Sequence, residues 1–349
     1  MKNGHTKSSG AAGEKLEKLR EVMSGRQKPL ILIYRNPDPD SLSSAWALKE
    51  IMRMNGLTAT IAYTGEVGRL ENEAMIKYLR VPVGPLNSDD LYAADLVALV
   101  DSQPDFYKGV DLPRCDIVID HHPVKSPLDV PYADIRMHCL ATASILTSYL
   151  EESETPVGVR LATALYYGIL TDSRYRQKNS SITDKNALLF LDGKVNRTVL
   201  RRIEFSSYSL RTLNYFNIAL IKLRHSRNVL YSDMGPVPTS DVCVQVADFL
   251  IRVKEANWAL VSGVVGRKLV IVFRCDGHKK DAGRTAQAAF GELGSAGGHS
   301  TMGRAEIDES ALPDGILLTQ NEKVERFILT SLANYERGFR PILRTLSRE

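Results

Sequence analysis

The sequence has few cysteines and no long apolar run. Its four cysteines are far apart among 349 residues and form no C-x-x-C pair, which argues against a disulfide framework and a zinc ribbon. No segment approaches the roughly 20 apolar residues that a membrane-spanning helix needs, and the polar first residues contain no apolar signal core. We therefore expect reduced thiols, a cytoplasmic location and no membrane partner.

The sequence also has little net charge. Lys and Arg number 45 against 41 Asp and Glu, which gives a formal net charge of +4. So mild an excess does not predict a surface for a long nucleic-acid duplex, although a local basic patch can bind a short anion. A composition of 44% hydrophobic and 25% charged residues is typical of globular proteins, and the length allows two domains.

Apolar runs that alternate with helical periodicity predict an α/β first domain. The predicted buried strands are 29–35, 58–63, 95–101 and 115–122. The predicted helices are 14–23, 42–56, 71–80, 142–152 and 158–173. Continuous apolar strands separated by helices are typical of a parallel sheet that is covered on both faces.

A second, smaller α/β domain is predicted further along the chain. Its strand-like runs are 229–235, 258–266 and 268–276, and its helical stretches are 239–254 and 282–294. We expect a partly disordered leader over 1–27, a metal-binding domain over 28–182, a helical connector over 183–227 and a substrate-binding domain over 228–340. The catalytic cleft is expected between the two domains.

Acidic residues and imidazoles follow several of the predicted elements. They are Asp38 and Asp40 after the first strand, Asp101 after the third, Asp120, His121 and His122 at the end of the fourth, and Asp172 near the end of a later helix. Any one aspartate is more simply a helix cap or a turn residue. In an open parallel sheet, however, ligands bind beyond the carboxyl ends of the strands, where most of these side chains would meet.

Carboxylates gathered around one crevice predict a metal site. They repel one another at a cost of several kcal/mol, on the order of what a buried unpaired charge costs, unless cations neutralise them. Carboxylates with one or two imidazoles suit Mn²⁺ or Mg²⁺. A carboxylate shared by two ions would form a site that lowers the pKa of a bound water and holds phosphoryl oxygens. Phosphoester hydrolysis by a metal-activated water is the predicted chemistry.

The motifs N-P-D-x-D-S, V-D, D-H-H, T-D and G-G-H, which follow one another over about 28–310, resemble the DHH phosphoesterase family with a DHH-associated C-terminal domain. By architecture the sequence is most similar to the family members that degrade very short RNAs and dephosphorylate 3′,5′-bisphosphoadenosine, which are often described as exopolyphosphatase-like. The resemblance implies two Mn²⁺ sites, with Mg²⁺ or Co²⁺ as alternatives. It also implies a short single-stranded RNA, DNA or nucleotide as substrate, and a homodimer.

The resemblance further implies a role for each residue of the first-domain motifs. The implied ligands are Asp40, Asp101, His121 and Asp172 for one ion, and Asp38 and Asp101 for the second. Asp101 would then bridge the two ions. His122 would face the scissile phosphate, where it would stabilise charge or assist proton transfer. Asp120 would orient an imidazole from outside the coordination sphere.

Three segments are predicted to hold substrate. Arg274, at the end of a predicted strand, matches the family's substrate-holding arginine and can bind a phosphate bidentately. The turn Gly297-Gly298-His299 lets backbone N–H groups approach a phosphate or a ribose. Arg174, just after the T-D motif, is a further predicted phosphate contact.

One residue departs from the family pattern. The family usually has a histidine four residues before the first aspartate of its leading motif, where this sequence has Tyr34, and a neutral phenol is a weak metal ligand. Two functions therefore stay open. The first is a phosphoesterase acting on short oligonucleotides, a nucleoside bisphosphate, or a linear or cyclic dinucleotide. The second is a nucleotide-binding regulatory protein with weakened catalysis.

Overall fold

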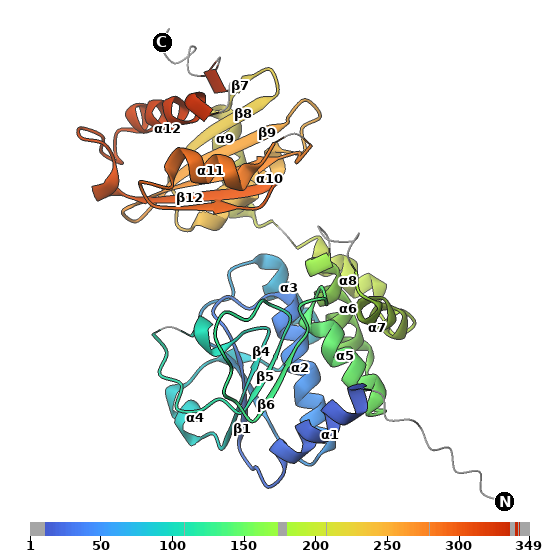
Figure 1. The fold of residues 1–349 in the computed structure, drawn as a ribbon. Coiled ribbons are helices and arrows are strands. Elements are labelled where there is room, and N and C mark those ends of the chain that lie inside the picture. The colour runs from blue at the N-terminus through green and yellow to red at the C-terminus, as the bar shows by residue number, and fades with distance from the viewer. Residues whose placement is uncertain are drawn as a thin grey trace, which may run out of the picture. The chain divides into compact units, whose positions relative to one another are not determined.

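Two six-stranded sheets organise the chain, one in each of two units (Figure 1). The computed structural model describes residues 11–107, 109–173, 180–206, 208–278, 280–335, 339–340 and 342. The first unit extends from Met1 to Ser207 and the second from Tyr208 to Glu349. In the described ranges no helix has the length and apolar character that crossing a membrane requires.

The first unit contains the predicted parallel sheet. Its strands are β1 (Pro29–Ile33), β2 (Thr60–Tyr63), β3 (Gly84–Pro85), β4 (Leu96–Val100), β5 (Ile117–Asp120) and β6 (Tyr132–Ile135). Their order is β3-β2-β1-β4-β5-β6, and each neighbouring pair is parallel. Every residue of β1, β4 and β5 is buried, as a sheet covered on both faces requires. The predicted fold class is confirmed.

Helices cover the two faces of this sheet unequally. They are α1 (Ala11–Met23), α2 (Pro39–Met54), α3 (Leu70–Leu79), α4 (Ser88–Ala93), α5 (Thr142–Glu152), α6 (Val159–Ser173), α7 (Ile182–Asp192) and α8 (Arg197–Glu204), with the short 3₁₀ helix η1 (Pro104–Phe106). Ile31 and Val100 point into a large core with α1, α2, α5 and α6. Leu30 and Leu99 point to the opposite face, where α4 and the segment around η1 complete a smaller core.

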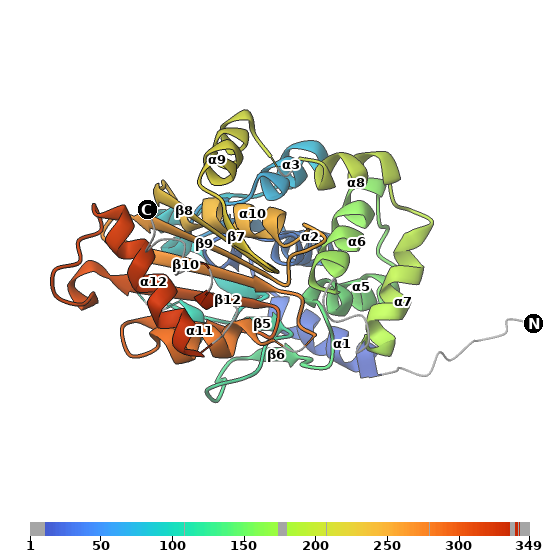
Figure 2. The same cartoon turned by 90° about the horizontal axis from the view of Figure 1, so that it is seen from above.

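The second unit has a mixed sheet, in which β8 and β9 form a parallel pair and the other neighbouring strands pair antiparallel. The strands, in the order β11-β12-β10-β9-β8-β7, are β7 (Arg224–Ser226), β8 (Val229–Pro236), β9 (Trp258–Val265), β10 (Lys268–Cys275), β11 (Ser295–Gly298) and β12 (Met302–Asp308). The helices are α9 (Leu210–Ile221), α10 (Ser240–Leu250), α11 (Ala282–Phe290) and α12 (Asn321–Tyr335), with the 3₁₀ helix η3 (Glu309–Ala311). Helices α11 and α12 pack on one face, and α9 and α10 pack on the other (Figure 2).

The segment 183–227, expected to be a helical connector, contributes to both cores. Leu191 of α7 and Leu200 of α8 are buried in the core of the first unit. Phe216 and Ala219 of α9 are buried in the second. We propose that the domain boundary lies near Ser207, where the two units divide, because the helices on either side are anchored by their own apolar faces.

Candidate metal centre

The acidic residues of the first unit meet where the strand order reverses. Strands β1 and β4 lie next to each other, although the chain passes through β2 and β3 between them. A crevice forms beyond the carboxyl ends of the strands at such a point. Asp38 and Asp40 follow β1, Asp101 follows β4, and His121 follows β5. The side chains that follow these three strands therefore lie together at the carboxyl edge of the sheet.

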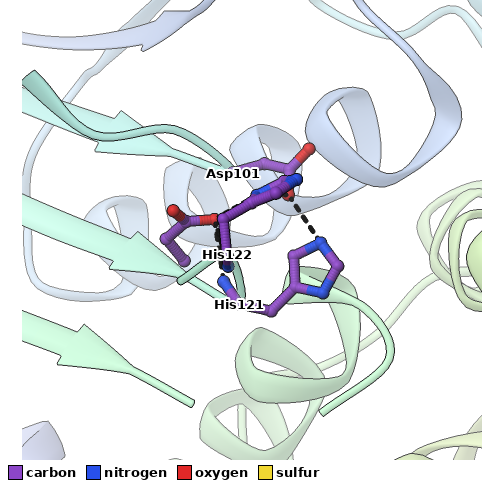
Figure 3. Close-up of side chains that lie close together, drawn as sticks. Asp101, His121 and His122 are labelled. Carbon is purple, nitrogen blue, oxygen red and sulfur yellow. Dashed lines mark hydrogen bonds and ion pairs between the residues drawn. The ribbon is translucent and has the colours of Figure 1, made fainter. Parts of the chain in front are cut away.

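His121 is the residue on which three carboxylates converge. Its Nε2 atom lies 3.5 Å from Oδ1 of Asp101, 3.6 Å from Oδ2 of Asp172 and 3.9 Å from Oδ2 of Asp40. Figure 3 shows the imidazole beside the Asp101 carboxylate. This Nε2 is buried and has no hydrogen-bond partner in the described part of the chain. A buried polar atom left without a partner needs a physical reason.

A divalent cation fits between these groups. Bonds of about 2.0–2.2 Å from one ion to nitrogen and oxygen ligands place the ligand atoms about 3–4 Å from one another. The donor atoms of Asp40, His121 and Asp172 all lie within 4.8 Å of one another, and so do those of a second group. That second group is Asp101, Asp120, His121 and His122. A ligand set of carboxylates with imidazole suits Mn²⁺ or Mg²⁺.

The N-terminus of α5 holds two of the carboxylates. Backbone N–H groups of Thr142 and Ala143 donate to Oδ2 and Oδ1 of Asp40, each over 2.7 Å. The Thr142 hydroxyl donates to Oδ1 of Asp101 over 3.0 Å. The first N–H groups of a helix have no partner within the helix and carry partial positive charge, so they are suited to a buried carboxylate. Asp40 is thereby fixed on the first turn of α2.

The charged forms of these carboxylates are energetically unfavourable in the absence of a cation. Burial raises the pKa of Asp40, and the neighbouring Asp38 raises it further. Burial raises the pKa of Asp101 well above its ordinary value, and the charges of Asp40, Asp38, Asp120 and Asp172 act in the same direction. A positive ion at this point would remove both penalties.

Asp101 also has an unusual backbone conformation. Its φ of 55° lies in the left-handed region, which is unfavourable by roughly 1–2 kcal/mol for a residue with a Cβ. Its N–H group donates to the carbonyl of Ile119 over 3.0 Å, which ties the end of β4 to β5. Backbone strain of this kind is found where a functional side chain must be aimed, and here it directs Asp101 toward His121 and Thr142.

Asp120 orients His122 rather than the imidazole of His121. Its Oδ1 lies 2.8 Å from Nδ1 of His122, and its Oδ2 accepts from Nε2 of Gln103 over 2.7 Å. This hydrogen bond raises the pKa of His122. Burial alone would raise the pKa of Asp120, but the bonds from His122 and Gln103 outweigh burial and lower it. The His121 imidazole has a different neighbour, because its Nδ1 lies 3.4 Å from the carbonyl oxygen of Cys139.

Asp38 and Tyr34 are placed differently from the other motif residues. Asp38 is the N-cap of α2, where its side chain accepts from the N–H of Ser41 over 2.9 Å. Tyr34 packs against Phe106 and Tyr107. Neither joins the two potential ligand groups found among the described residues. The structure thus brings together the ligands predicted for one ion, while Asp38 approaches the cluster from a capping position.

The predicted substrate residues of the second unit make contacts of their own. Nε of Arg274 lies 2.6 Å from Oδ1 of Asp248, so this guanidinium is ion-paired. Gly297 and Gly298 end β11 with φ of 153° and 140°, and a Cβ on Gly298 would lie 2.2 Å from the carbonyl of Met302. Gly298 thus permits a close approach to the protein's own strand β12. His299 follows them and is exposed.

Arg174 lies outside the described residues.

Three residues that contact the acidic cluster were not predicted from the sequence. They are Gln103, Thr142 and Ala143. Thr142 was expected only as the first residue of a helix, and nothing in the spacing indicates that its N–H and hydroxyl face the carboxylates. Gln103 follows Asp101 by two residues, and only that proximity could have suggested it.

The parallel sheet of the first unit and its acidic cluster lie in a part of the chain that matches a known protein family. Residues 28–169 match the family model described as DHH family, N-terminal domain. This part of the chain is therefore similar to the DHH family, as its motifs indicated.

Two curated relatives and one solved structure are similar to the chain. An uncharacterized protein of Methanocaldococcus jannaschii is 33% identical over 88% of this chain and 62% of its own length. A probable bifunctional oligoribonuclease and PAP phosphatase of Streptococcus mutans is 30% identical over 41% of this chain and 45% of its own length. The chain thus spans less than two thirds of either relative. The structure of an exopolyphosphatase-related protein from Bacteroides fragilis has 14% identity and a TM-score of 0.68, and covers 95% of this chain and 98% of its own. This last likeness shows the fold alone.

Proposed function

We propose that the protein is a metal-dependent phosphoester hydrolase. The observation that carries the proposal is the buried, unpartnered Nε2 of His121 among the carboxylates of Asp40, Asp101 and Asp172. The match of residues 28–169 to the DHH family model supports it. These four residues would hold the ion, for which Mn²⁺ is the first choice and Mg²⁺ or Co²⁺ the alternatives.

The residues around the ion would divide the work between binding and proton transfer. A bound divalent ion supplies a water of lowered pKa and an electrophile for phosphoryl oxygens. Asp101, fixed by Thr142, would orient this water. His122, whose pKa Asp120 raises through a hydrogen bond, would stay protonated at higher pH and donate to the leaving oxygen. Asp38, whose charge reaches Asp40 and Asp101, would contribute to a second, weaker site.

Short oligonucleotides and 3′,5′-bisphosphoadenosine are the proposed substrates. The name of the Streptococcus mutans relative combines oligoribonuclease and PAP phosphatase activities, and that relative matches part of this chain. The mild net charge favours a small anion over a long duplex. We propose that Arg274, Gly297, Gly298 and His299 contribute to substrate binding. Sedimentation at several concentrations would check the expected homodimer.

Substrate turnover and ion binding test this proposal together. Purified protein with Mn²⁺ would be offered a dinucleotide, 3′,5′-bisphosphoadenosine, a cyclic dinucleotide and pyrophosphate. We expect turnover of at least one of the first three. Asp101→Ala should lower kcat by at least about 100-fold and weaken Mn²⁺ binding in calorimetry. Asp105→Ala, which changes an exposed aspartate four residues away, is the control. A near-wild-type rate in Asp101→Ala would remove the proposed role of this residue.

A nucleotide-binding protein with weak catalysis is the alternative. Its specific support is that Tyr34 packs into an aromatic cluster and Asp38 caps α2, so the ligands of a second ion are not gathered as those of the first are. Saturable nucleotide binding without turnover of any of the four compounds would favour this alternative.

A further inference from the structure

An aromatic cluster formed by Tyr34, Phe106 and Tyr107 lies beside His122. The ring centroid of Tyr34 is 5.1 Å from that of Tyr107 and 5.9 Å from that of Phe106. The Phe106 ring meets the His122 ring edge to face, with 5.8 Å between centroids. Tyr107 is buried and its hydroxyl lies 3.1 Å from that of Ser102, whereas Phe106 and Tyr34 are only partly buried. The cluster therefore extends an aromatic surface away from the imidazole that is proposed to face the phosphate.

Arg35 adds a positive charge to this surface, and its backbone is held in an unfavourable conformation. Its φ is 48°, and its N–H group donates to Oγ1 of Thr64 over 2.9 Å. The neighbouring Gly65 allows close contact, because a Cβ there would lie 2.8 Å from the Cα of Arg35. The guanidinium carbon is 5.1 Å from the centroid of the Tyr34 ring, and Arg35 is exposed. Two loop residues thus fix the backbone of Arg35, and its guanidinium lies beside the Tyr34 ring.

The conformation of Arg35 is not explained by helix or hairpin geometry. Arg80 has a similar φ of 55°, but it ends α3, where a left-handed residue terminates the helix. Arg35 lies instead in the loop between β1 and the Asp38 cap, beyond the same strand end as the metal centre. Among the described non-glycine residues, Asp101 also has a positive φ directly after a strand of this sheet. Strain of this kind beside a candidate metal centre supports a functional position for the side chain.

We propose that Phe106 and Arg35 form a nucleoside subsite next to the metal centre. The Phe106 ring would stack on the base that adjoins the scissile phosphate, and the Arg35 guanidinium would bind a second phosphate of the same substrate. A partly exposed aromatic cluster with a guanidinium beside it is a combination that binds single-stranded nucleotides with little sequence preference. This inference rests on the proposed function for the identity of the substrate. It explains why Tyr34 can stand where a metal ligand is usual, since its ring supports Phe106 and Arg35.

A dinucleotide that carries 2-aminopurine provides the test. Its fluorescence is quenched when the base stacks on an aromatic ring, which a purely structural role for Phe106 would not produce. Titrations would be made in EDTA, where a metal-dependent hydrolase cannot consume the probe, and repeated with Mn²⁺. The variants are Phe106→Leu, which keeps apolar packing, Phe106→Tyr, which keeps a ring, and Arg35→Asn, which tolerates positive φ without the charge. Arg80→Asn is the matched control, because it removes an exposed arginine of similar φ from the end of α3.

The proposal predicts quenching in the wild type, in Phe106→Tyr and in Arg80→Asn. Phe106→Leu should lose the quenching and raise Kd about tenfold, which is within the range of base–aromatic stacking. Arg35→Asn should raise Kd about tenfold and keep the quenching. Unchanged quenching and Kd in Phe106→Leu, or an unquenched probe with the wild type, would overturn the subsite. If Phe106→Leu unfolds at a lower temperature, loss of quenching in Phe106→Tyr or an unchanged Kd in Arg35→Asn would overturn it equally.

The failure of the subsite can be distinguished from the failure of the proposed function. Wild-type protein that quenches the probe but hydrolyses none of the four substrates would contradict the function and support the subsite. Normal hydrolysis with unchanged probe binding in Phe106→Leu would contradict the subsite and support the function.

Discussion

The candidate metal centre lowers the stability of the folded protein when no ion is bound. The residues responsible are Asp40, Asp101 and His121. Both carboxylates are at most 7% exposed, and burial raises the pKa of each. The imidazole nitrogen that faces them has no hydrogen-bond partner among the described residues. Such a cluster is costly unless a cation binds to it, since apolar residues of similar size would be more stable. Stability and metal binding should therefore change in opposite directions when a ligand is replaced.

Asp101→Asn is expected to stabilise the metal-free protein at neutral pH by about 1–3 kcal/mol. Because the pKa of Asp101 is raised on folding, its charge penalises the folded state as pH increases above the ordinary value of 3.8. The difference between variant and wild type should accordingly disappear in acid, where the carboxyl is protonated in both states. Asparagine also tolerates the positive φ of this position. Urea unfolding in EDTA between pH 4 and 8 measures the difference.

The same variant should lose the stabilisation that Mn²⁺ gives. An ion at 100 times its Kd stabilises the wild type by about 2.7 kcal/mol, whereas the variant should show much less. Asp105→Asn removes an exposed charge nearby and should behave as the wild type does in both experiments. A metal-free Asp101→Asn protein that is less stable than the wild type would contradict the prediction that the Asp101 charge destabilises the folded state.

At the scale of elements, α5 acts on the centre through its first residues. The N–H groups of Thr142 and Ala143 hold Asp40, and the Thr142 hydroxyl reaches Asp101. One helix end thus fixes the carboxylates that follow two different strands. Groups that orient ligands in this way affect metal affinity without contacting the ion.

Thr142→Val should weaken Mn²⁺ binding about 10-fold to 100-fold, because it removes the hydroxyl donor and keeps the backbone donors and the side-chain volume. Thr147→Val in the same helix is the matched control, since the Thr147 hydroxyl bonds within α5, to the carbonyl of Ala143. Isothermal calorimetry with Mn²⁺ measures both affinities. Equal affinities for the two variants would show that the Thr142 hydroxyl does not position Asp101.

Strands with a continuous apolar run could be predicted from the sequence. Strands and contacts that depend on how distant segments pack could not. Strands β1, β4 and β5 are continuous apolar runs and were predicted within a few residues. Strand β3 has two residues, one of them a proline, and β6 is only half-buried, so neither has an apolar run to reveal it. The acidic residues were predicted to gather because parallel strands end at one edge. The contacts of Thr142 depend on where α5 lands, which periodicity does not specify.

At the scale of the whole molecule, each unit has its own apolar cores. Those of the first unit contain buried residues between 16 and 203, and those of the second contain buried residues between 216 and 342. Two groups of strand-like runs predicted two α/β domains. The mixed pairing of the second sheet could not be predicted, because pairing direction depends on contacts such as Val229 with Trp258, which are distant in sequence. Independent cores predict units that can unfold separately.

Calorimetric unfolding should therefore show two transitions, and Mn²⁺ should raise the temperature of only one. The ion would bind between residues of the first unit, so by mass action it stabilises that unit alone. At 100 times its Kd the ion would contribute about 2.7 kcal/mol, which corresponds to a rise of about 5–11 °C for a unit of roughly 200 residues. In Asp101→Asn neither transition should move with Mn²⁺. Arg274→Ala changes the second unit only, so it should shift the metal-insensitive transition and identify it. A shift of both transitions with Mn²⁺ would show that the two units unfold as one or that the ion has ligands in each.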